Sequence, residues 1–191
     1  MHPSIHFAQY QEAVSRSSGR EMAAQCCLSS IGLDGYPNAR FVALKEIKDE
    51  SFIITGSLAS RKGREVKINP RVALTFWWSS IGVQVRIQGN AEPISVEQAK
   101  RYFQKRSRLA QLSALASEQG EYFTNGLDLH KEVDRIDEEF RAKDLPLPKK
   151  WGGFAIHPVR MEFLEFQDSR LHDRTLYQMQ DGNWTSVKLQ P

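Results

Sequence analysis

The chain has 191 residues and a formal net charge of +3, from 26 lysines and arginines against 23 aspartates and glutamates. Hydrophobic residues make up 40% and charged residues 26%, which is typical of one globular domain and excludes an intrinsically disordered chain. No apolar run approaches the roughly 18 residues that a membrane span needs. The small net charge argues against nucleic-acid binding.

The first half of the chain is predicted to contain a helix at 5–20 and then mostly strands. Asp34-Gly35 is a strong turn signal between two extended segments. Ser60 is a candidate helix cap, and its helix must end near Asn69-Pro70 because proline disfavours helix in the preceding residue. Apolar or alternating segments predict strands at 23–31, 39–47, 51–55, 71–78 and 83–91.

The second half begins with helices and ends with strands. Ser95 and Gln98 stand at capping-box spacing. Helices are predicted at 95–108, 109–119 and 127–143, and strands at 154–166, 175–180 and 184–189, after the connector Leu145-Pro146-Leu147-Pro148. Hairpin turns outnumber strand–helix–strand crossovers, so the prediction is a mainly β protein with edge helices (α+β), an antiparallel and partly closed barrel.

The cysteines, the N-terminus and the histidines indicate the compartment and exclude some chemistry. Cys26 and Cys27 are adjacent in an apolar run, so buried thiols are expected rather than a disulfide. The first residues lack the pattern of a signal peptide, and a cytoplasmic location is expected. The five histidines show no metal-ligand spacing, so no metal site is predicted.

Basic residues cluster at two places, 60–71 and 100–108. Arg61 and Lys62 would lie in a helix first turn, where the helix dipole disfavours cations. A bound phosphate would resolve the conflict, and a solvent-exposed basic turn is the alternative. Arg40 and Lys45 stand at opposite ends of one strand and have opposite parity, so they serve one ligand only across a strand edge or through a bulge.

Two further segments have both a binding and a purely structural interpretation. The strand 83–91 has a polar face that includes Gln84, which suits either a ligand groove or plain solvation. The run 169–174 places Arg170, His172 and Arg174 in one loop. Such a loop suits an anionic ring substrate with His172 as a proton carrier, or a salt-bridged turn of little energetic value.

Seven motifs occur along the chain in the order of one enzyme family. They are the Arg-x-Val-x-Leu-Lys strand at 40–45, Ser60-Arg61-Lys62, Asn69-Pro70, Gln84-Val85, Tyr102-Phe103, Trp151-Gly152-Gly153 and Arg170-Leu171-His172-Asp173-Arg174. On these motifs, over almost its whole length, the chain resembles the pyridoxamine 5′-phosphate oxidase family of flavin enzymes. The resemblance implies an FMN-binding split β-barrel and a homodimer with its active sites at the subunit interface.

The resemblance also implies roles for individual residues. The implied FMN contacts are Arg40, Lys45, Thr55, Arg61, Lys62, Gln84, Gln119 and Arg174. The implied substrate contacts are Lys45, Tyr102, Arg106, Arg170 and His172, of which Arg170 and His172 are the catalytic pair. The chain departs from the family pattern at Gly56, Ala110, Gly120 and Leu164, and the N-terminal extension is expected to be short or absent.

The implied reaction is the oxidation of pyridoxamine 5′-phosphate and pyridoxine 5′-phosphate to pyridoxal 5′-phosphate, by hydride transfer to FMN with O2 reduced to H2O2. Alternatives are a related oxidase of another aromatic substrate, of the phenazine type, and a non-catalytic protein that binds flavin or haem. Residues 1–191 are expected to form one domain with a helical segment at 1–20, a helical insertion at 95–143 and strands at 150–191 that carry the substrate loop. The expected partners are a second copy, a small phosphorylated pyridine and O2, with no nucleic acid and no membrane.

Overall fold

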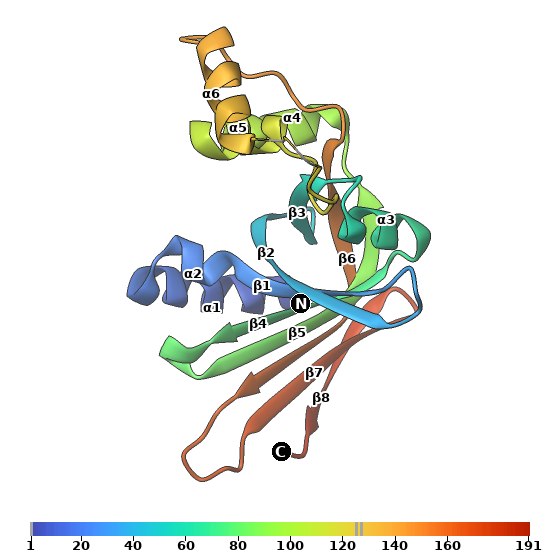
Figure 1. The fold of residues 1–191 in the computed structure, drawn as a ribbon. Coiled ribbons are helices and arrows are strands. Elements are labelled where there is room, and N and C mark those ends of the chain that lie inside the picture. The colour runs from blue at the N-terminus through green and yellow to red at the C-terminus, as the bar shows by residue number, and fades with distance from the viewer. Residues whose placement is uncertain (1, 125, 127) are drawn as a thin grey trace.

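The computed structural model describes residues 2–124, 126 and 128–191, and its main feature is a closed antiparallel barrel (Figure 1). The strands are β1 (Gln25–Ile31), β2 (Pro37–Lys48), β3 (Ser51–Ser57), β4 (Arg71–Trp78), β5 (Val83–Pro93), β6 (Trp151–Glu165), β7 (Asp173–Gln180) and β8 (Asn183–Leu189). They form one sheet in the order β3-β2-β1-β4-β5-β6-β7-β8. An additional β3–β6 pairing closes β1–β6 into a barrel, which confirms the predicted fold class.

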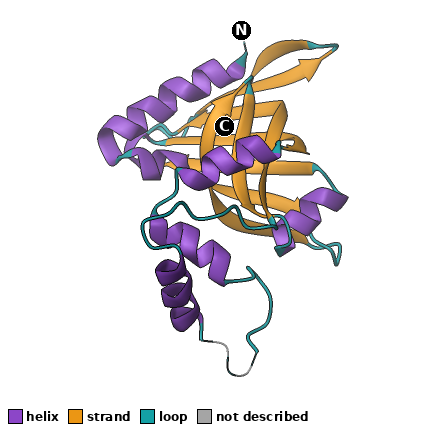
Figure 2. Ribbon diagram, turned by 90° about the horizontal axis from the view of Figure 1, so that it is seen from above, coloured by secondary structure: helices purple, strands orange, loops and turns teal. Residues whose placement is uncertain are grey.

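The helices lie around this barrel (Figure 2). They are α1 (Pro3–Ser18), α2 (Arg20–Ala24), α3 (Arg61–Ile68), α4 (Val96–Gln104), α5 (Arg108–Ala116) and α6 (Leu129–Glu139), with a 3-10 turn at Ser79–Ile81. The first strand starts later than predicted, because Ala23 and Ala24 belong to α2. Residues 1 and 127, where the expected N-terminal segment and third insertion helix begin, lie outside the described residues.

The barrel core follows from the alternation in the strands. In β5, Val83, Val85 and Ile87 are buried while the polar residues between them are half-buried or exposed. Helix α1 adds Phe7, which is fully buried and packs edge-on against Phe52 and Phe76 at ring distances of 5.0 and 4.8 Å. The first helix is therefore part of the barrel core and not an appendage.

Helices α4–α6 form a separate group at one end of the barrel, inserted between β5 and β6 (Figure 1). Pro93 at the end of β5 and Phe154 near the start of β6 are register partners, so the chain leaves and re-enters the sheet at one place. The group has its own small core of Phe103, Leu112, Ile136 and Leu145. This insertion covers one mouth of the barrel and places its loops beside β2 and β3.

The long strand β6 connects two distant parts of the molecule. Its first residues, from Trp151, pair with β3, whereas its last residues, to Glu165, pair with β7. At about 3.3 Å per residue, these two ends are separated by about 45 Å of strand. Residues placed at the two ends of β6 therefore belong to different regions of one chain.

Candidate active site

A cavity of about 590 Å³ lies between the barrel and the inserted helices. Its walls come from β2, β3, the start of α3, the helix α5 and the two loops around 117–121 and 148–151. Five of the predicted site residues line it, namely Lys45, Thr55, Lys62, Arg106 and Gln119. The structure therefore gathers side chains that are up to 74 positions apart in the sequence, from Lys45 to Gln119.

Three of these residues are cations without an acidic partner. No carboxylate in the described part of the chain forms a salt bridge with Lys45, Lys62 or Arg106. Burial lowers the pKa of Lys45, and nearby Arg106 lowers it further. Burial, followed by Arg40, likewise lowers the pKa of Lys62. Uncompensated positive charge in a partly buried cavity is an environment that favours an anion.

Lys45 owes its position to a break in the strand. Leu44 pairs with Ile54, and Glu46 pairs with Ile53, which is adjacent to Ile54 on the antiparallel strand. Lys45 therefore has no register partner and is the extra residue of a β-bulge. Arg40, of opposite parity, does not line the cavity and instead bonds to Ser30 and Glu65. The two cations of this strand thus have different surroundings, although the bulge at Lys45 breaks the strict alternation on which the sequence argument relied.

The basic helix start contains two cations with different partners. Ser60 caps α3, with its hydroxyl accepting from the Gly63 N–H. Lys62 donates to Ser60 Oγ at 3.1 Å and to Gln119 Oε1 at 2.9 Å, and both acceptors are neutral. Arg61 is paired with two acids, Asp34 and Glu65. The conflict with the helix dipole is therefore relieved by carboxylates at Arg61 but not at Lys62.

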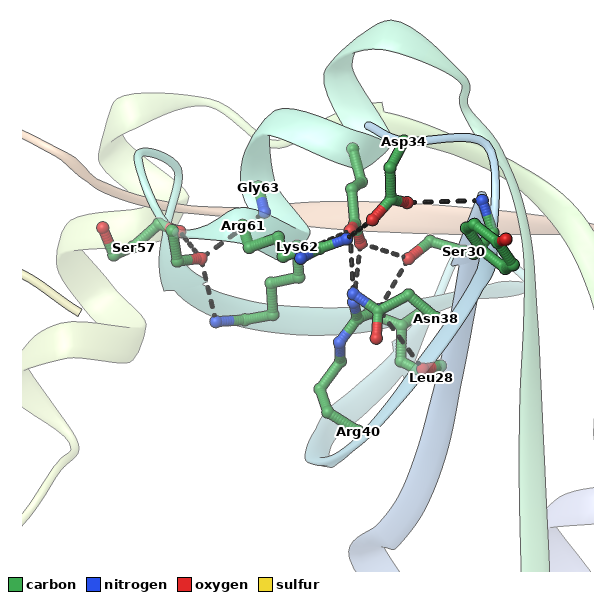
Figure 3. Close-up of polar contacts among 12 residues, drawn as sticks. Leu28, Ser30, Asp34, Asn38, Arg40, Ser57, Arg61, Lys62 and Gly63 are labelled. Atoms are coloured by element: carbon green, nitrogen blue, oxygen red, sulfur yellow. Dashed lines mark hydrogen bonds and ion pairs between the residues drawn. The ribbon is translucent and has the colours of Figure 1, made fainter. Parts of the chain in front are cut away.

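Glu65 contacts two of the predicted site residues, Arg40 and Arg61, and the sequence interpretation gave it no role. Its side chain is buried, and its carboxylate accepts hydrogen bonds from Arg61, Arg40, Ser30 and Asn38 (Figure 3). Burial alone would raise the pKa of Glu65, but these four bonds outweigh it and hold the pKa at about 2. The available signal was its spacing, four residues after Arg61 on one helix face.

Of the two predicted substrate contacts near the end of α4, Arg106 lines the cavity and Tyr102 does not. The Tyr102 ring is buried and its hydroxyl donates to Glu46, next to the bulged Lys45. Burial and this bond raise the pKa of Tyr102 above its usual range. The Arg106 guanidinium lies 4.3 Å from the centre of the Trp151 ring, a cation–π contact that fixes its orientation.

The remaining predicted site residues form a second group, at the other end of β6. Gln84 lies on β5 opposite Leu164, and Arg174 lies on β7 opposite the same residue. Arg170 and His172 belong to the loop between β6 and β7. None of these four lines the cavity. The structure thus divides the predicted residues into a cavity group and a loop group.

In the loop group Arg170 is exposed and the other three residues are half-buried, and exposed aromatic rings lie beside the loop. Phe166 packs 5.0 Å from Trp77 and 4.6 Å from His172, measured between ring centres. His172 Nδ1 accepts a hydrogen bond from the Gln167 N–H, so the neutral ring carries its proton on Nε2. Arg170 has a φ of 64°, a strained conformation for a residue with a side chain. The loop therefore leaves the His172 Nε2–H as a hydrogen-bond donor, and it holds the Arg170 backbone in the left-handed region.

Arg174 is held by a second buried carboxylate, Glu162. Arg174 Nη2 donates to Glu162 Oε1 at 2.7 Å, and Arg86 pairs with the other oxygen. All three residues lie on neighbouring strands, β5, β6 and β7. Burial would raise the pKa of Glu162, but the two arginines lower it below its usual range. This cluster fixes the strands that carry the loop.

Two types of site find no support in the structure. None of the helices in the described residues is long and apolar enough to cross a membrane. Among these same residues, no three His, Cys, Asp or Glu side chains gather where they could hold a metal ion.

Comparison with family models identifies the chain. Residues 19–140 match the model described as pyridoxamine 5′-phosphate oxidase, which is more than half of the sequence. The chain belongs to the pyridoxamine 5′-phosphate oxidase family. Residues 151–191 match a second model, described as the pyridoxine 5′-phosphate oxidase C-terminal dimerisation region, and this match contains Arg170, His172 and Arg174 of the loop group.

Individual relatives agree with this assignment. The chain is 39% identical over 164 residues to a pyridoxine/pyridoxamine 5′-phosphate oxidase from Thermosynechococcus vestitus, covering 86% of this chain and 77% of that protein. It is 36% identical to the enzyme of the same name from Leptospira interrogans, over 99% of this chain and 88% of that one.

Solved structures of similar fold include two that match along the whole chain. PhzG from Burkholderia lata, solved with tetrahydrophenazine-1-carboxylic acid, has a TM-score of 0.91 at 24% identity and covers 100% of this chain and 94% of its own. An FMN-binding protein related to pyridoxamine 5′-phosphate oxidase, from Nostoc punctiforme, has a TM-score of 0.80 at 16% identity and covers 100% and 99%. At these identities the likeness concerns the fold.

Proposed function

We propose that the protein is an FMN-dependent oxidase that converts pyridoxamine 5′-phosphate and pyridoxine 5′-phosphate to pyridoxal 5′-phosphate. The observation that carries the proposal is the cavity with three cations, Lys45, Lys62 and Arg106, that no acid of the described chain neutralises. Both the proposed cofactor and the proposed substrates carry a phosphate group. Relatives at 36–39% identity bear the name of this activity.

The residues around Lys62 fit the phosphate of FMN. The ammonium group of Lys62 retains donor capacity beyond its two neutral partners. A Cβ atom at Gly56 would lie 3.2 Å from the end of the Lys62 side chain, so the glycine leaves this end of the cavity open. Lys62 and Gln119 line this part of the cavity, with Arg40 and Arg61 behind them, and these four would hold the phosphate.

The other end of the cavity fits the phosphate of the substrate. Arg106 lies close enough to Lys45 to lower its pKa, and Tyr102 bonds to Glu46, the residue after Lys45. The indole N–H of Trp151, which lines the cavity, is buried and has no hydrogen-bond acceptor among the described residues. An anchored phosphate supplies binding energy remote from the reacting carbon, which helps to orient the substrate ring.

The loop group has a proposed role at the pyridine ring. The two-electron chemistry belongs to bound FMN, with hydride accepted from the 4′ carbon and O2 reduced to H2O2. Arg170 places a positive charge beside the ring, and His172 offers its Nε2 proton as a hydrogen-bond donor. Gln84 and Arg174 would contact the flavin.

The separation of the two groups along β6 supports a homodimer. A ligand that contacts both the cavity group and the loop group needs them from two copies, because about 45 Å of strand separates them within one chain. The exposed Trp77 and Phe166 provide an apolar surface on the loop side. The free thiols Cys26 and Cys27 agree with the proposed cytoplasmic location.

The proposed function is tested by isolating the protein and recording its visible spectrum with and without added FMN. Peroxide release is then measured with pyridoxine 5′-phosphate, with pyridoxamine 5′-phosphate and with non-phosphorylated aromatic amines and alcohols. We expect a yellow protein that is active only on the phosphorylated pyridines. A protein that cannot be loaded with FMN, or one that prefers a non-phosphorylated ring, contradicts the proposal.

A further inference from the structure

We propose that Glu65 is a positioning residue for the phosphate of the flavin, because its carboxylate fixes Arg40 and Arg61 near Lys62 while each arginine keeps an N–H donor that no described residue uses. The inference rests on the proposed function. It assigns a role to a buried acid that touches neither the cavity wall nor a bound ligand.

The carboxylate of Glu65 is fully used within the protein. Its Oε2 accepts from Arg40 Nη2 at 2.6 Å and from Ser30 Oγ at 2.7 Å. Its Oε1 accepts from Asn38 Nδ2 at 2.8 Å and from Arg61 Nε at 2.9 Å. Four short bonds to two oxygens saturate the acceptor capacity of a carboxylate, so Glu65 can hold its partners in only one arrangement.

These bonds connect three separate elements (Figure 3). Ser30 lies on β1, Asn38 and Arg40 lie on β2, and Arg61 lies with Glu65 on α3. Ser30 also accepts from Arg40 Nη1 at 2.6 Å, so the serine hydroxyl and the carboxylate hold the two ends of one guanidinium. The start of α3, which carries Lys62, is thereby fixed relative to β2.

Each arginine keeps a donor that the cluster does not use. Arg40 bonds through Nη1 and Nη2, and Arg61 bonds through Nε and through Nη2 to Asp34. Within the described residues, Arg40 Nε and Arg61 Nη1 make no hydrogen bond. Arg40, Arg61 and Lys62 carry three positive charges. Glu65 and Asp34 carry two negative charges, so one positive charge is left to attract an anion.

A negative charge beside an anion site is a cost unless it has an orienting role. Glu65 weakens the attraction of the arginines for phosphate, and its low pKa keeps it charged at any working pH. In return, two long side chains that would otherwise sample many rotamers are ordered before the ligand arrives. The sign of the effect of removing the charge therefore distinguishes positioning from competition.

The test compares FMN with riboflavin, which is the same flavin without its phosphate. Dissociation constants for both are measured by quenching of flavin fluorescence in the wild-type protein, Glu65→Gln, Ser30→Ala and the control Glu162→Gln. Glu162 is also a buried acid between two arginines, and one of them, Arg174, is proposed to contact the flavin outside its phosphate. Its variant therefore disturbs contacts that FMN and riboflavin share and should change both constants equally. The ratio of the two constants isolates the contribution of the phosphate.

We expect Glu65→Gln to lower the preference for FMN over riboflavin about ten-fold, because the amide offers one acceptor oxygen where the carboxylate has two. Riboflavin affinity stays unchanged, and Glu162→Gln keeps the wild-type ratio. Ser30→Ala, which removes one hydroxyl only, lowers the ratio about three-fold and decides the matter if Glu65→Gln does not fold. An unchanged or increased ratio in the folded Glu65 variant overturns the proposal, since the carboxylate would then be inert or a competitor.

The outcome is separable from the proposed function. If the wild-type protein binds neither flavin, or binds both equally, the proposed FMN site fails before Glu65 is tested. If the wild-type protein prefers FMN and the Glu65 and Ser30 variants keep that preference, only the positioning role of Glu65 fails.

Discussion

The cavity group and the loop group differ in almost every physical respect. The cavity residues Lys45, Lys62 and Arg106 are partly buried, carry positive charge without acidic partners and are surrounded by parts of one chain. The loop residues Arg170 and His172 stand on a connection between strands, beside exposed aromatic rings. Under the proposed function, the cavity would bind an anion within a single chain, whereas the loop side would supply only half of a binding surface.

This difference separates two tasks that one active site must perform. Binding phosphate groups needs fixed charge in a partly desolvated place, which a single fold can supply. Contacting a flat ring from both sides needs a second surface, which the loop group would obtain from another copy. The buried acids follow the same division, since Glu65 stands behind the cavity and Glu162 behind the loop.

Removing a cavity cation is expected to have the largest effect. In Lys62→Met, the dissociation constant for FMN should rise roughly 100-fold, since a charged hydrogen bond in a buried site contributes up to about 3 kcal/mol. The exposed Lys67 on the same helix provides the control variant Lys67→Met, which should bind FMN normally. Fluorescence titration of the apoprotein measures both, and normal FMN binding by Lys62→Met would contradict the cavity assignment.

Changing the loop should affect turnover and leave the cofactor in place. Arg170→Ala is expected to lower kcat roughly 30-fold while the protein remains yellow, because the lost charge acts at the ring and not at a phosphate. The exposed Arg141 of the inserted segment offers a control, Arg141→Ala, with unchanged kcat. A yellow Arg170→Ala variant of normal activity would remove Arg170 from the site.

Mixing these two inactive variants tests the division directly. If each site combines the cavity of one copy with the loop of another, a heterodimer of Lys62→Met and Arg170→Ala has one intact site and one doubly altered site. Random exchange makes half of the dimers mixed, so about a quarter of wild-type activity should return. No recovery after exchange, with mixed dimers verified by mass spectrometry, would mean that both groups act within one chain.

A smaller effect is expected at the substrate phosphate. Arg106→Ala should raise KM for pyridoxine 5′-phosphate roughly 20-fold, since one charge-assisted bond is lost, and should change kcat little. Binding of FMN, measured by fluorescence, is the internal control. An equal fall in kcat with unchanged KM would show that Arg106 acts in the transition state instead of holding the phosphate.

The smallest predicted effect is a dependence on alkaline pH. Burial lowers the pKa of Lys62, so this lysine loses its charge at a lower pH than a free lysine would. FMN affinity should therefore fall a few-fold as the pH rises through that lowered pKa, and stay constant below it down to about pH 7, above the second ionisation of the FMN phosphate. Lys62→Arg should flatten this decline because arginine stays protonated, and an equally steep decline in that variant would place the titrating group elsewhere.

Local features of the fold were predictable from the sequence. The turn at Asp34-Gly35, the cap at Ser60 and the capping box of Ser95 and Gln98 depend on neighbouring residues, and each lies where it was expected. The β3–β6 pairing that closes the barrel was not predictable in detail, because register between strands some 100 residues apart leaves no local pattern.

The sequence pointed to candidate site residues but not to their arrangement. The motifs pointed to Lys62 and Arg170 equally, and nothing in their spacing placed them in separate groups. The helix-start argument foresaw an unsatisfied cation but could not tell that Arg61 would find Asp34 and Glu65, because those contacts depend on tertiary packing. The bulge at Lys45 was considered only as a possibility, since one inserted residue is invisible in an apolar strand.

The chain leaves the sheet at Pro93 and re-enters it at Phe154, and these two residues are register partners. The inserted helices therefore begin and end at one place on the sheet. The inserted segment contains Tyr102, Arg106 and Gln119, whereas Lys45 and Lys62 lie outside it, on β2 and α3. Under the proposed function, Gln119 of the inserted segment would contact FMN, and Lys45 of the barrel would contact the substrate. Exchanging residues 94–150 as a block would therefore change contacts to both molecules while leaving the strands of the barrel intact.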